Sequence, residues 1–163
     1  MKSIIGTPKA DSSVSEGGAL FSIGAIFSGF NETSTAGQDY RLSRFQASQL
    51  WQAFVNNVDP IVKILHIPTT QATVFAAINN PTNIDKDLEA LLFSIYFAAI
   101  TSLPADTVAH LLNQPKNDAL RNFKCRIEQC LAGANILDTP SIRSLQAMAI
   151  YLVRQFLCEV SIL

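Results

Sequence analysis

The run of residues at 88–103 constrains the fold more than any other part of the chain, because it is apolar almost all the way round a helix. Its polar interruptions are Glu89, Ser94, Thr101 and Ser102. A helix that is apolar on every face is buried in a protein core or lies in a membrane. A run of this length with polar interruptions falls short of a membrane span. We therefore expect 88–103 to be the central helix of a core.

The segment 49–68 is expected to form a corner against which other helices pack. Its apolar positions recur at helical spacing and are Leu50, Trp51, Phe54, Val55 and Val58. Pro60 lacks a backbone donor and disfavours helix at the residue before it, so the first helix ends there. A second short helical piece is expected beyond the proline, with Ile61, Ile64 and Leu65 continuing the same apolar face.

The remaining apolar patterns also repeat at helical spacing. Further helices are expected at 69–79, 104–113, 118–134 and 140–157. Asn83 or Asp85 is expected to cap the 88–103 helix, and Thr139 to cap the last helix with Pro140 in its first position. The packing face of that last helix is predicted to consist of Ile142, Leu145, Met148 or Ala149, Leu152 and Phe156. A solvated outer face on the 118–134 helix is predicted to carry Arg121, Lys124, Arg126 and Glu128.

These patterns predict an all-α fold, an irregular helical bundle of antiparallel helix pairs joined by short connectors. The 163 residues are enough for a single core, and the charged fraction of 15% is low for a soluble domain. The helices therefore either bury one another thoroughly or lack part of their packing partner. A net charge of -1 gives no basic surface for nucleic acid, so no specific nucleic-acid binding is expected.

The first 42 residues differ from the rest of the chain. Their Ser- and Gly-rich start shows no periodicity and predicts a flexible N-terminal arm at 1–42, followed by a helical domain at 43–163. Within the arm, 20–30 is a short apolar segment with glycines at 24 and 29, which favours a docked segment or hairpin over a signal peptide. No membrane span is expected, because this segment is too short.

Beyond these patterns, the chain resembles a known family. The string LWxxFxxNVDPxxKILHxPT at 50–69 resembles the opening of the regulatory domain of fungal zinc binuclear cluster transcription factors. The resemblance continues in order: 89–101 is similar to that family's EALxFAIYFxAVTSL helix, 123–137 to its EQALxxADFL segment, and 145–153 to its LQAxxxYLV helix. It covers roughly residues 43–154.

This resemblance implies a transcription-regulatory module. Members of the family bind DNA through an N-terminal cluster of six cysteines that holds two zinc ions, and nothing before Ser43 matches that cluster. The family's arginine-rich continuation is likewise unmatched after Phe156. The implied function is a truncated module that acts through protein contacts or is inert. A functional truncation, a gene-model fragment and a repurposed remnant all fit. The implied partners are a second copy or a full-length relative, and the implied location is nuclear, otherwise cytoplasmic.

The residues show no catalytic, cofactor-binding or metal-binding pattern, so we expect neither an enzyme nor a bound cofactor. Cys125, Cys130 and Cys158 lack the paired spacing of a zinc site and are interpreted as free thiols. Asp106 and His110 are spaced as a helical pair, but no nucleophile accompanies them at a recognisable spacing. Alternate acidic residues at the start of the central helix, Asp85, Asp87 and Glu89, favour capping. His66 is interpreted as structural.

A second function class stays open alongside regulation. The chain is also compatible with a small helical protein that binds or converts an apolar small molecule. The aromatic residues that would line its pocket are Phe75, Phe93, Tyr96, Phe97, Phe123 and Tyr151. Such side chains are more often plain core.

Overall fold

The computed structural model describes residues 42–82, 84–134 and 140–160, with side chains through residue 156. These residues fall within one unit of the chain, Gly37–Leu163. The arm expected at 1–42 lies outside them, apart from Leu42. Every regular element in the described ranges is an α-helix, which confirms the all-α prediction. The helices are α2 (Arg44–Asn57), α3 (Ile67–Asn79), α4 (Lys86–Ser102), α5 (Ala105–Leu112), α6 (Lys116–Gly133) and α7 (Ile142–Val160).

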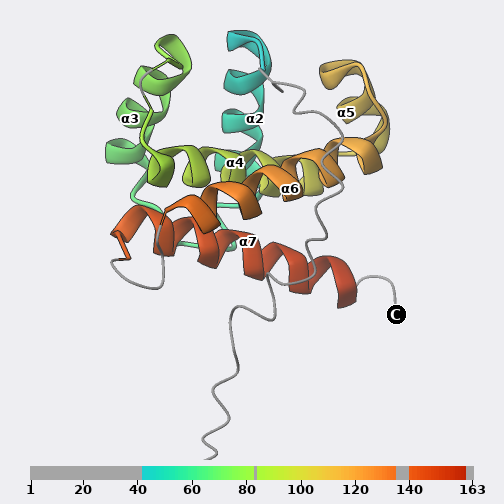
Figure 1. The fold of residues 1–163 in the computed structure, drawn as a ribbon. Helices are drawn as coiled ribbons and strands as arrows, with labels where there is room; N and C mark the ends of the chain where they lie inside the picture. Colours follow the sequence, from blue (N-terminus) through green and yellow to red (C-terminus); the bar gives the residue numbers. More distant parts are fainter. Residues whose placement is uncertain (1–41, 83, 135–139, 161–163) are drawn as a thin grey trace, which may run out of the picture. The chain divides into compact units, whose positions relative to one another are not determined.

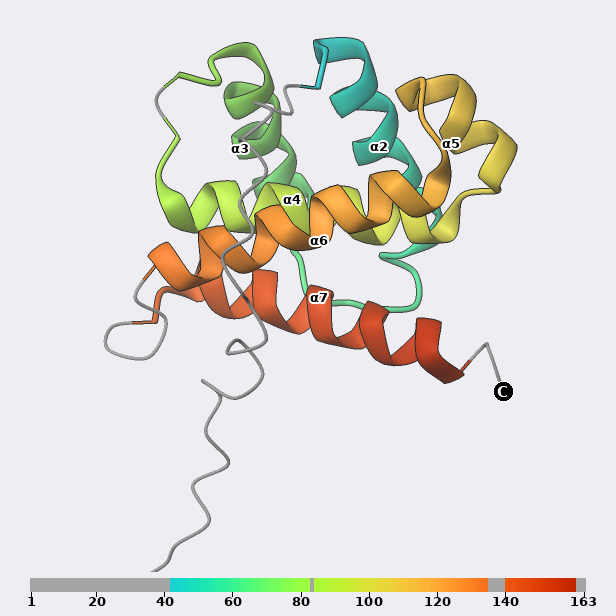
Figure 2. The ribbon, with the colours of Figure 1, turned by 45° about the vertical axis from the view of Figure 1, so that its right-hand side comes forward.

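Helix α4 is the centre of this unit, as its uniformly apolar sequence predicts. It packs against α2, α6 and α7. Figures 1 and 2 show α4, α6 and α7 lying across the molecule, with α2, α3 and α5 standing on one side of them. Ten consecutive or near-consecutive positions of α4 are buried: Ala90, Leu91, Leu92, Ser94, Ile95, Tyr96, Phe97, Ala98, Ala99 and Ile100. None of the described helices combines the length and apolarity needed to cross a membrane.

Both ends of α4 are held by side chains from outside the helix body. The Leu88 backbone N–H donates to Asp85 Oδ1 at 2.7 Å, so Asp85 is the N-cap, one of the two predicted candidates. At the other end, Lys116 Nζ donates to the Thr101 and Leu103 carbonyl oxygens at 3.0 and 2.6 Å. A cation at a helix C-terminus satisfies free carbonyls and complements the helix dipole.

The expected corner at 49–68 forms only in part. Helix α2 begins earlier than its apolar pattern, at Arg44, because Ser43 and Gln46 form a capping box. The prediction of a second helical piece after Pro60 is wrong. The chain makes one turn, in which the Val62 N–H donates to the Val58 carbonyl, and then runs without helix to α3. Ile61 is 72% exposed and does not continue the apolar face.

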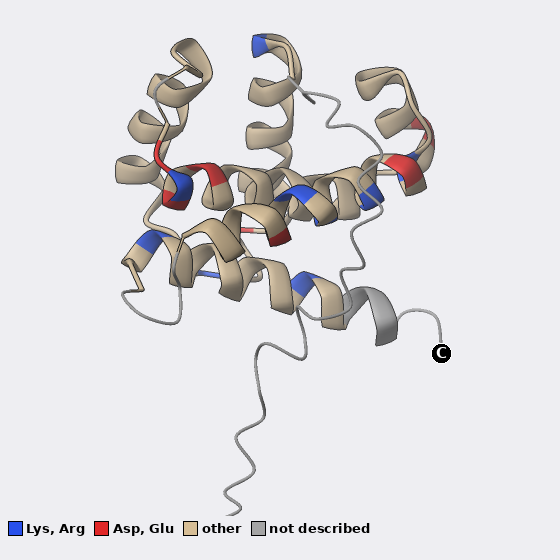
Figure 3. Ribbon diagram, viewed as in Figure 1, with Lys and Arg blue, Asp and Glu red and all other residues tan. Residues whose placement is uncertain are grey.

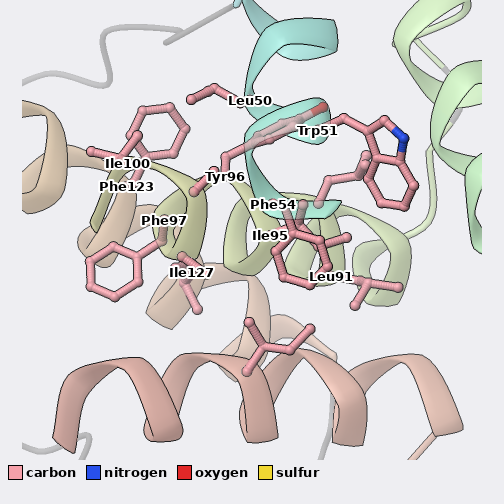
Figure 4. Packing of buried hydrophobic residues seen from close by; sticks show 14 of the residues in the cluster. Leu50, Trp51, Phe54, Leu91, Ile95, Tyr96, Phe97, Ile100, Phe123 and Ile127 are labelled. Atoms are coloured by element: carbon pink, nitrogen blue, oxygen red, sulfur yellow. The ribbon is translucent and has the colours of Figure 1, made fainter. Parts of the chain in front are cut away.

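The buried face of α2 matches its predicted positions. Trp51 is 2% exposed, and its ring stacks on Phe54 with 6.1 Å between centroids. Figure 4 shows these α2 side chains meeting those of α4, including Ile95 and Leu91. Trp51 is therefore a core residue, as its place on the apolar face predicts.

Helix α7 starts later and packs by a different face than predicted. It begins at Ile142, two residues after Pro140. Ser141 and Ser144 exchange backbone-to-hydroxyl hydrogen bonds of 3.0 and 3.1 Å, so Ser141 occupies the capping position. The residues that α7 buries are Ser144, Ala147, Ile150 and Tyr151. The face predicted to pack is therefore mainly the outward one.

Candidate functional site

The most exposed apolar feature of the described residues is a stripe along α7. We define this outer stripe as Ile142, Leu145, Ala149, Leu152 and Phe156. Ile142, Leu145 and Phe156 are 77%, 49% and 64% exposed, and the other two are half-buried. Successive spacings of three and four residues keep the stripe on one side of the helix. The described positions on its flanks are Gln146, Met148, Val153 and Gln155, none of them charged.

The opposite side of α7 carries a buried polar contact. The Tyr151 hydroxyl donates to Glu128 Oε1 on α6 at 2.6 Å, and Glu128 is only 8% exposed. The prediction of a solvated outer face on α6 is therefore wrong for Glu128. Burial, together with the hydrogen bond to the carboxylate and its negative charge, raises the pKa of Tyr151. The phenol stays protonated and donates.

A second feature is a cavity of about 340 Å³ between α2, α3, α4, α6 and the loop before α4. The six aromatic residues predicted for an apolar pocket do not come together around it. Phe93 and Tyr96 line the cavity, while Phe97 pairs with Tyr151 at 5.6 Å between ring centroids. Phe123 packs against both Phe93 and Tyr96, at 5.8 and 6.4 Å. The prediction of a single aromatic pocket is therefore wrong.

Charged side chains gather on one edge of this cavity. Glu89 Oε1 accepts from Arg126 at 3.0 Å, and its Oε2 accepts from Lys86 at 2.9 Å. Burial acts against ionisation of Glu89, but these two cations outweigh it and hold its pKa below the usual range. The same contact with Glu89 raises the pKa of Lys86. The Arg126 guanidinium also lies 5.6 Å from the Phe93 ring centroid.

The candidate chemical groups lie apart from one another. Asp106 and His110 are exposed on α5, and Asp85 caps α4 while pairing with Arg143 at 3.3 Å. His66 Nδ1 lies 2.8 Å from the Thr69 hydroxyl at the start of α3. Charged positions are sparse along the described helices (Figure 3). Within those helices and their connections, no three His, Cys, Asp or Glu side chains lie close enough together to hold a metal ion.

The thiols differ from one another in environment. Cys125 is exposed and Cys130 is buried, and both are free. Burial, with the nearby Glu89 charge, raises the pKa of the Cys130 thiol to about 12. A thiol with a raised pKa is a poor nucleophile, which fits a structural role. Cys158 lies beyond the last described side chain.

Sequence reasoning missed the participation of Arg44 and Arg126 at the cavity. Arg44 sits in the first turn of α2, and its Nη2 donates to the Asn79 carbonyl at the end of α3. Arg126 belongs to α6, far along the chain. No local pattern signals that two such cations share a cavity, because tertiary packing alone brings α2 and α6 to it.

The chain is similar in sequence to fungal transcription regulators. It is 34% identical over 122 residues to the aurofusarin cluster transcription factor aurR2 of Gibberella zeae, covering 74% of this chain and 18% of that protein. It is 35% identical over 105 residues to the transcriptional regulator AacuB of Aspergillus aculeatus, covering 64% of this chain and 14% of that protein. A third relative is the pyriculol/pyriculariol biosynthesis cluster transcription factor 1 of Pyricularia oryzae, 33% identical over 105 residues and covering 64% of this chain and 14% of that protein.

The chain is homologous to part of the fungal C6 zinc cluster transcription factors, which confirms the family resemblance. Two of these relatives are named as transcription factors of biosynthesis clusters, one for aurofusarin and one for pyriculol/pyriculariol. The matches span 14% to 18% of the length of these three curated relatives. No family model matches the chain. No solved structure matches it.

Proposed function

We propose that this chain is a helical regulatory module in the control of secondary metabolite clusters, that it acts in the nucleus, and that it works by contact with a second copy of itself. Homology to transcription regulators supports the regulatory role. The outer stripe of α7 is the observation that carries the mode of action. Apolar side chains that project into solvent along one side of a helix mark a contact surface.

The spacing of the stripe favours a helix as its partner. Alternating steps of three and four residues are the repeat that lets two helices interlock side chains along a shared seam. The stripe runs from Ile142 to Phe156, which at 1.5 Å per residue is about 20 Å of helix. That length matches a short helix pair. A symmetric pair of α7 helices would cover both stripes at once, since a two-fold interface joins the same patch on both partners.

The flanks of the stripe favour a second copy as the occupant. Charged residues beside such a seam select partners by attraction and exclude like-charged ones. The described flanking positions, Gln146, Met148, Val153 and Gln155, carry no charge. Two identical α7 helices therefore meet without like-charge repulsion. The same stripe on a longer homologous regulator would be recognised in the same way.

Specific DNA recognition is not part of this proposed role. The net charge of -1 offers little attraction for phosphates. We expect the chain to show no sequence-selective retention of duplex DNA at moderate salt, and no stoichiometric zinc after dialysis. A gel-shift series with competitor DNA and elemental analysis of the dialysed protein check both expectations. Selective duplex binding would contradict this part of the proposal.

Light scattering after size-exclusion chromatography tests the self-contact. The unmodified chain is expected to elute as a dimer. The variant carrying Ile142→Glu and Leu145→Glu is expected to elute as a folded monomer, because burying two carboxylates in an apolar seam is costly. Ile61→Glu is the matched control, since Ile61 is as exposed as Ile142 but lies outside the stripe. A monomeric unmodified chain, or a double variant that still dimerises, would refute the proposal.

A further inference from the structure

The cavity beside α4 has the size and lining of a small-molecule site. Its volume of about 340 Å³ lies in the range of ligand pockets. Apolar side chains from three helices form most of its wall, including Ala47 on α2, Ile78 on α3 and Leu92 on α4. Such a wall favours an apolar body over a sugar or a phosphate. Phe93 adds an aromatic face, against which a flat ring packs favourably.

A polar group inside the cavity wall has no protein partner. The Tyr96 side chain is 6% exposed and extends from α4 toward α2, with its hydroxyl at the far end (Figure 4). This hydroxyl makes no hydrogen bond to any of the described residues, and it is not among their fully buried unpartnered atoms, so solvent still reaches it. Burial raises the pKa of Tyr96, so the hydroxyl remains protonated at neutral pH. It is available to a bound oxygen atom.

The charge around the cavity favours an acidic ligand. Arg44 and Arg126 line it, and Glu89 is the acidic residue of the lining. Both Glu89 oxygens already accept from Arg126 and Lys86, so its charge is satisfied within the protein. Arg44 uses its Nη2 on the Asn79 carbonyl. A guanidinium has five N–H groups, so Arg44 retains donors for an anion at the cavity mouth.

We infer that this cavity binds a flat aromatic molecule carrying one weakly acidic group, with the ring against Phe93 and the acid facing Arg44. A hydroxyl or carbonyl oxygen elsewhere on the ligand is positioned to meet Tyr96. This inference stands independently of the α7 contact, because the cavity and the outer stripe share no residue. It assigns no chemical conversion to the site.

The test compares two probes of the same shape on the full chain. The anion 2-naphthoate is expected to bind more tightly than the neutral 2-naphthamide, by about tenfold at low ionic strength, because a charge-assisted hydrogen bond is about twice as strong as a neutral one. Titrations followed by ¹H–¹⁵N NMR measure both affinities and locate the site. The largest shifts are expected at residues of the cavity, such as Ala47 and Ala77.

Three variants decide the assignment. Arg44→Gln should lower naphthoate affinity about tenfold and leave naphthamide unchanged, because it removes the cation and keeps an amide. Arg121→Gln is the matched control, an exposed arginine of α6 outside the cavity, and should change neither affinity. Tyr96→Phe, which preserves the ring, should weaken a hydroxyl-bearing probe such as 6-hydroxy-2-naphthoate and leave naphthoate unchanged.

Several results would overturn the inference. Shifts confined to the α7 stripe would show that the probes bind an exposed apolar surface instead. Equal effects of Arg44→Gln and Arg121→Gln would show that the anion responds to general surface charge. Absence of binding up to the solubility limit of naphthoate would show that the cavity is closed to ligands.

Discussion

The Tyr151 hydroxyl and the Glu128 carboxylate, 2.6 Å apart, show what helical periodicity misses at the scale of single residues. Glu128 follows a row of charged residues on α6, and its local pattern placed it in solvent. Its burial depends on α7, which lies more than ten residues further along the chain and brings a phenol to it. Residues whose environment is set within one helix, such as Leu50 and Phe54, were correctly predicted as core.

The Tyr151–Glu128 contact makes a measurable contribution to stability. Tyr151→Phe should lower the free energy of unfolding by about 1.5–3 kcal/mol, the range for a hydrogen bond to a charged group. In a Glu128→Leu background the same substitution should cost less than about 1 kcal/mol, because the acceptor is gone. Urea unfolding of the four proteins completes the cycle. Equal costs in the two backgrounds would mean that the contact contributes nothing.

Trp51 should be among the most sensitive core positions. It is nearly fully buried and stacks on Phe54. Trp51→Ala should cost about 3–5 kcal/mol, the range for truncating a large buried aromatic residue. Ile61→Ala, at an exposed position of the following turn, should change stability by less than about 0.5 kcal/mol. A cost below about 1 kcal/mol for Trp51→Ala, measured by chemical denaturation, would contradict this packing.

At the scale of elements, the presence of each helix was easier to predict from the sequence than the face by which it packs. The apolar runs placed α3, α4, α5 and α6 within a few residues of their observed bounds. The sequence predicted helix α7 but assigned burial to the wrong face. The helix is apolar on both sides, and the prediction followed its larger side chains. The structure buries the side that carries Ser144 and Ala147, where small residues allow a close approach of helices. The strength of the apolar pattern alone does not indicate which side of α7 is buried.

The start of α2 offers a test of local capping. Ser43 Oγ accepts from the Gln46 N–H at 3.2 Å, and Gln46 Oε1 accepts from the Ser43 N–H at 2.9 Å. Ser43→Ala should lower the free energy of unfolding by about 1 kcal/mol, the usual effect of losing an N-cap. Ser48→Ala is the control within the same helix. Its hydroxyl bonds the Arg44 carbonyl one turn back, an arrangement that adds little, so the change should be neutral or slightly stabilising. Equal effects would contradict the capping role.

At the scale of the whole molecule, the fold class followed from the sequence and the candidate sites did not. One helix apolar on all sides requires neighbours on all sides, and α4 has α2, α6 and α7. The cavity arises where α2, α3 and α6 fail to close over α4, and that depends on side-chain sizes at many distant positions. The low charged fraction left two readings open, thorough mutual burial of the helices or a missing packing partner, and the exposed outer stripe of α7 fits the second.

The same apolar packing should make the folded chain sensitive to alkali. Burial raises the pKa of Cys130, Tyr96 and Tyr151, with Glu89 adding to the effect at Cys130 and Glu128 at Tyr151. In the unfolded chain these groups lose their protons near their ordinary values of 9.0 for the thiol and 10.0 for the phenols. Above those values the unfolded state binds fewer protons than the native state, so stability falls as pH rises. Below about pH 8.5 all three contributions are fully present.

Urea unfolding between pH 7 and pH 10.5, under reducing conditions, measures this dependence. The free energy of unfolding should be nearly flat to about pH 8.5, decline above pH 9 and decline more steeply above pH 10, by at most about 1.4 kcal/mol per pH unit for each group. Cys130→Ala should lower stability at pH 7 yet reduce the decline between pH 9 and 10 by about half, because Ala has no proton to lose and the rest of the decline comes from Tyr96 and Tyr151. Cys125→Ala is the control, an exposed thiol on the same helix. Its profile should match that of the unmodified chain, and a decline in Cys130→Ala as steep as that of the unmodified chain would show that the buried thiol does not contribute to it.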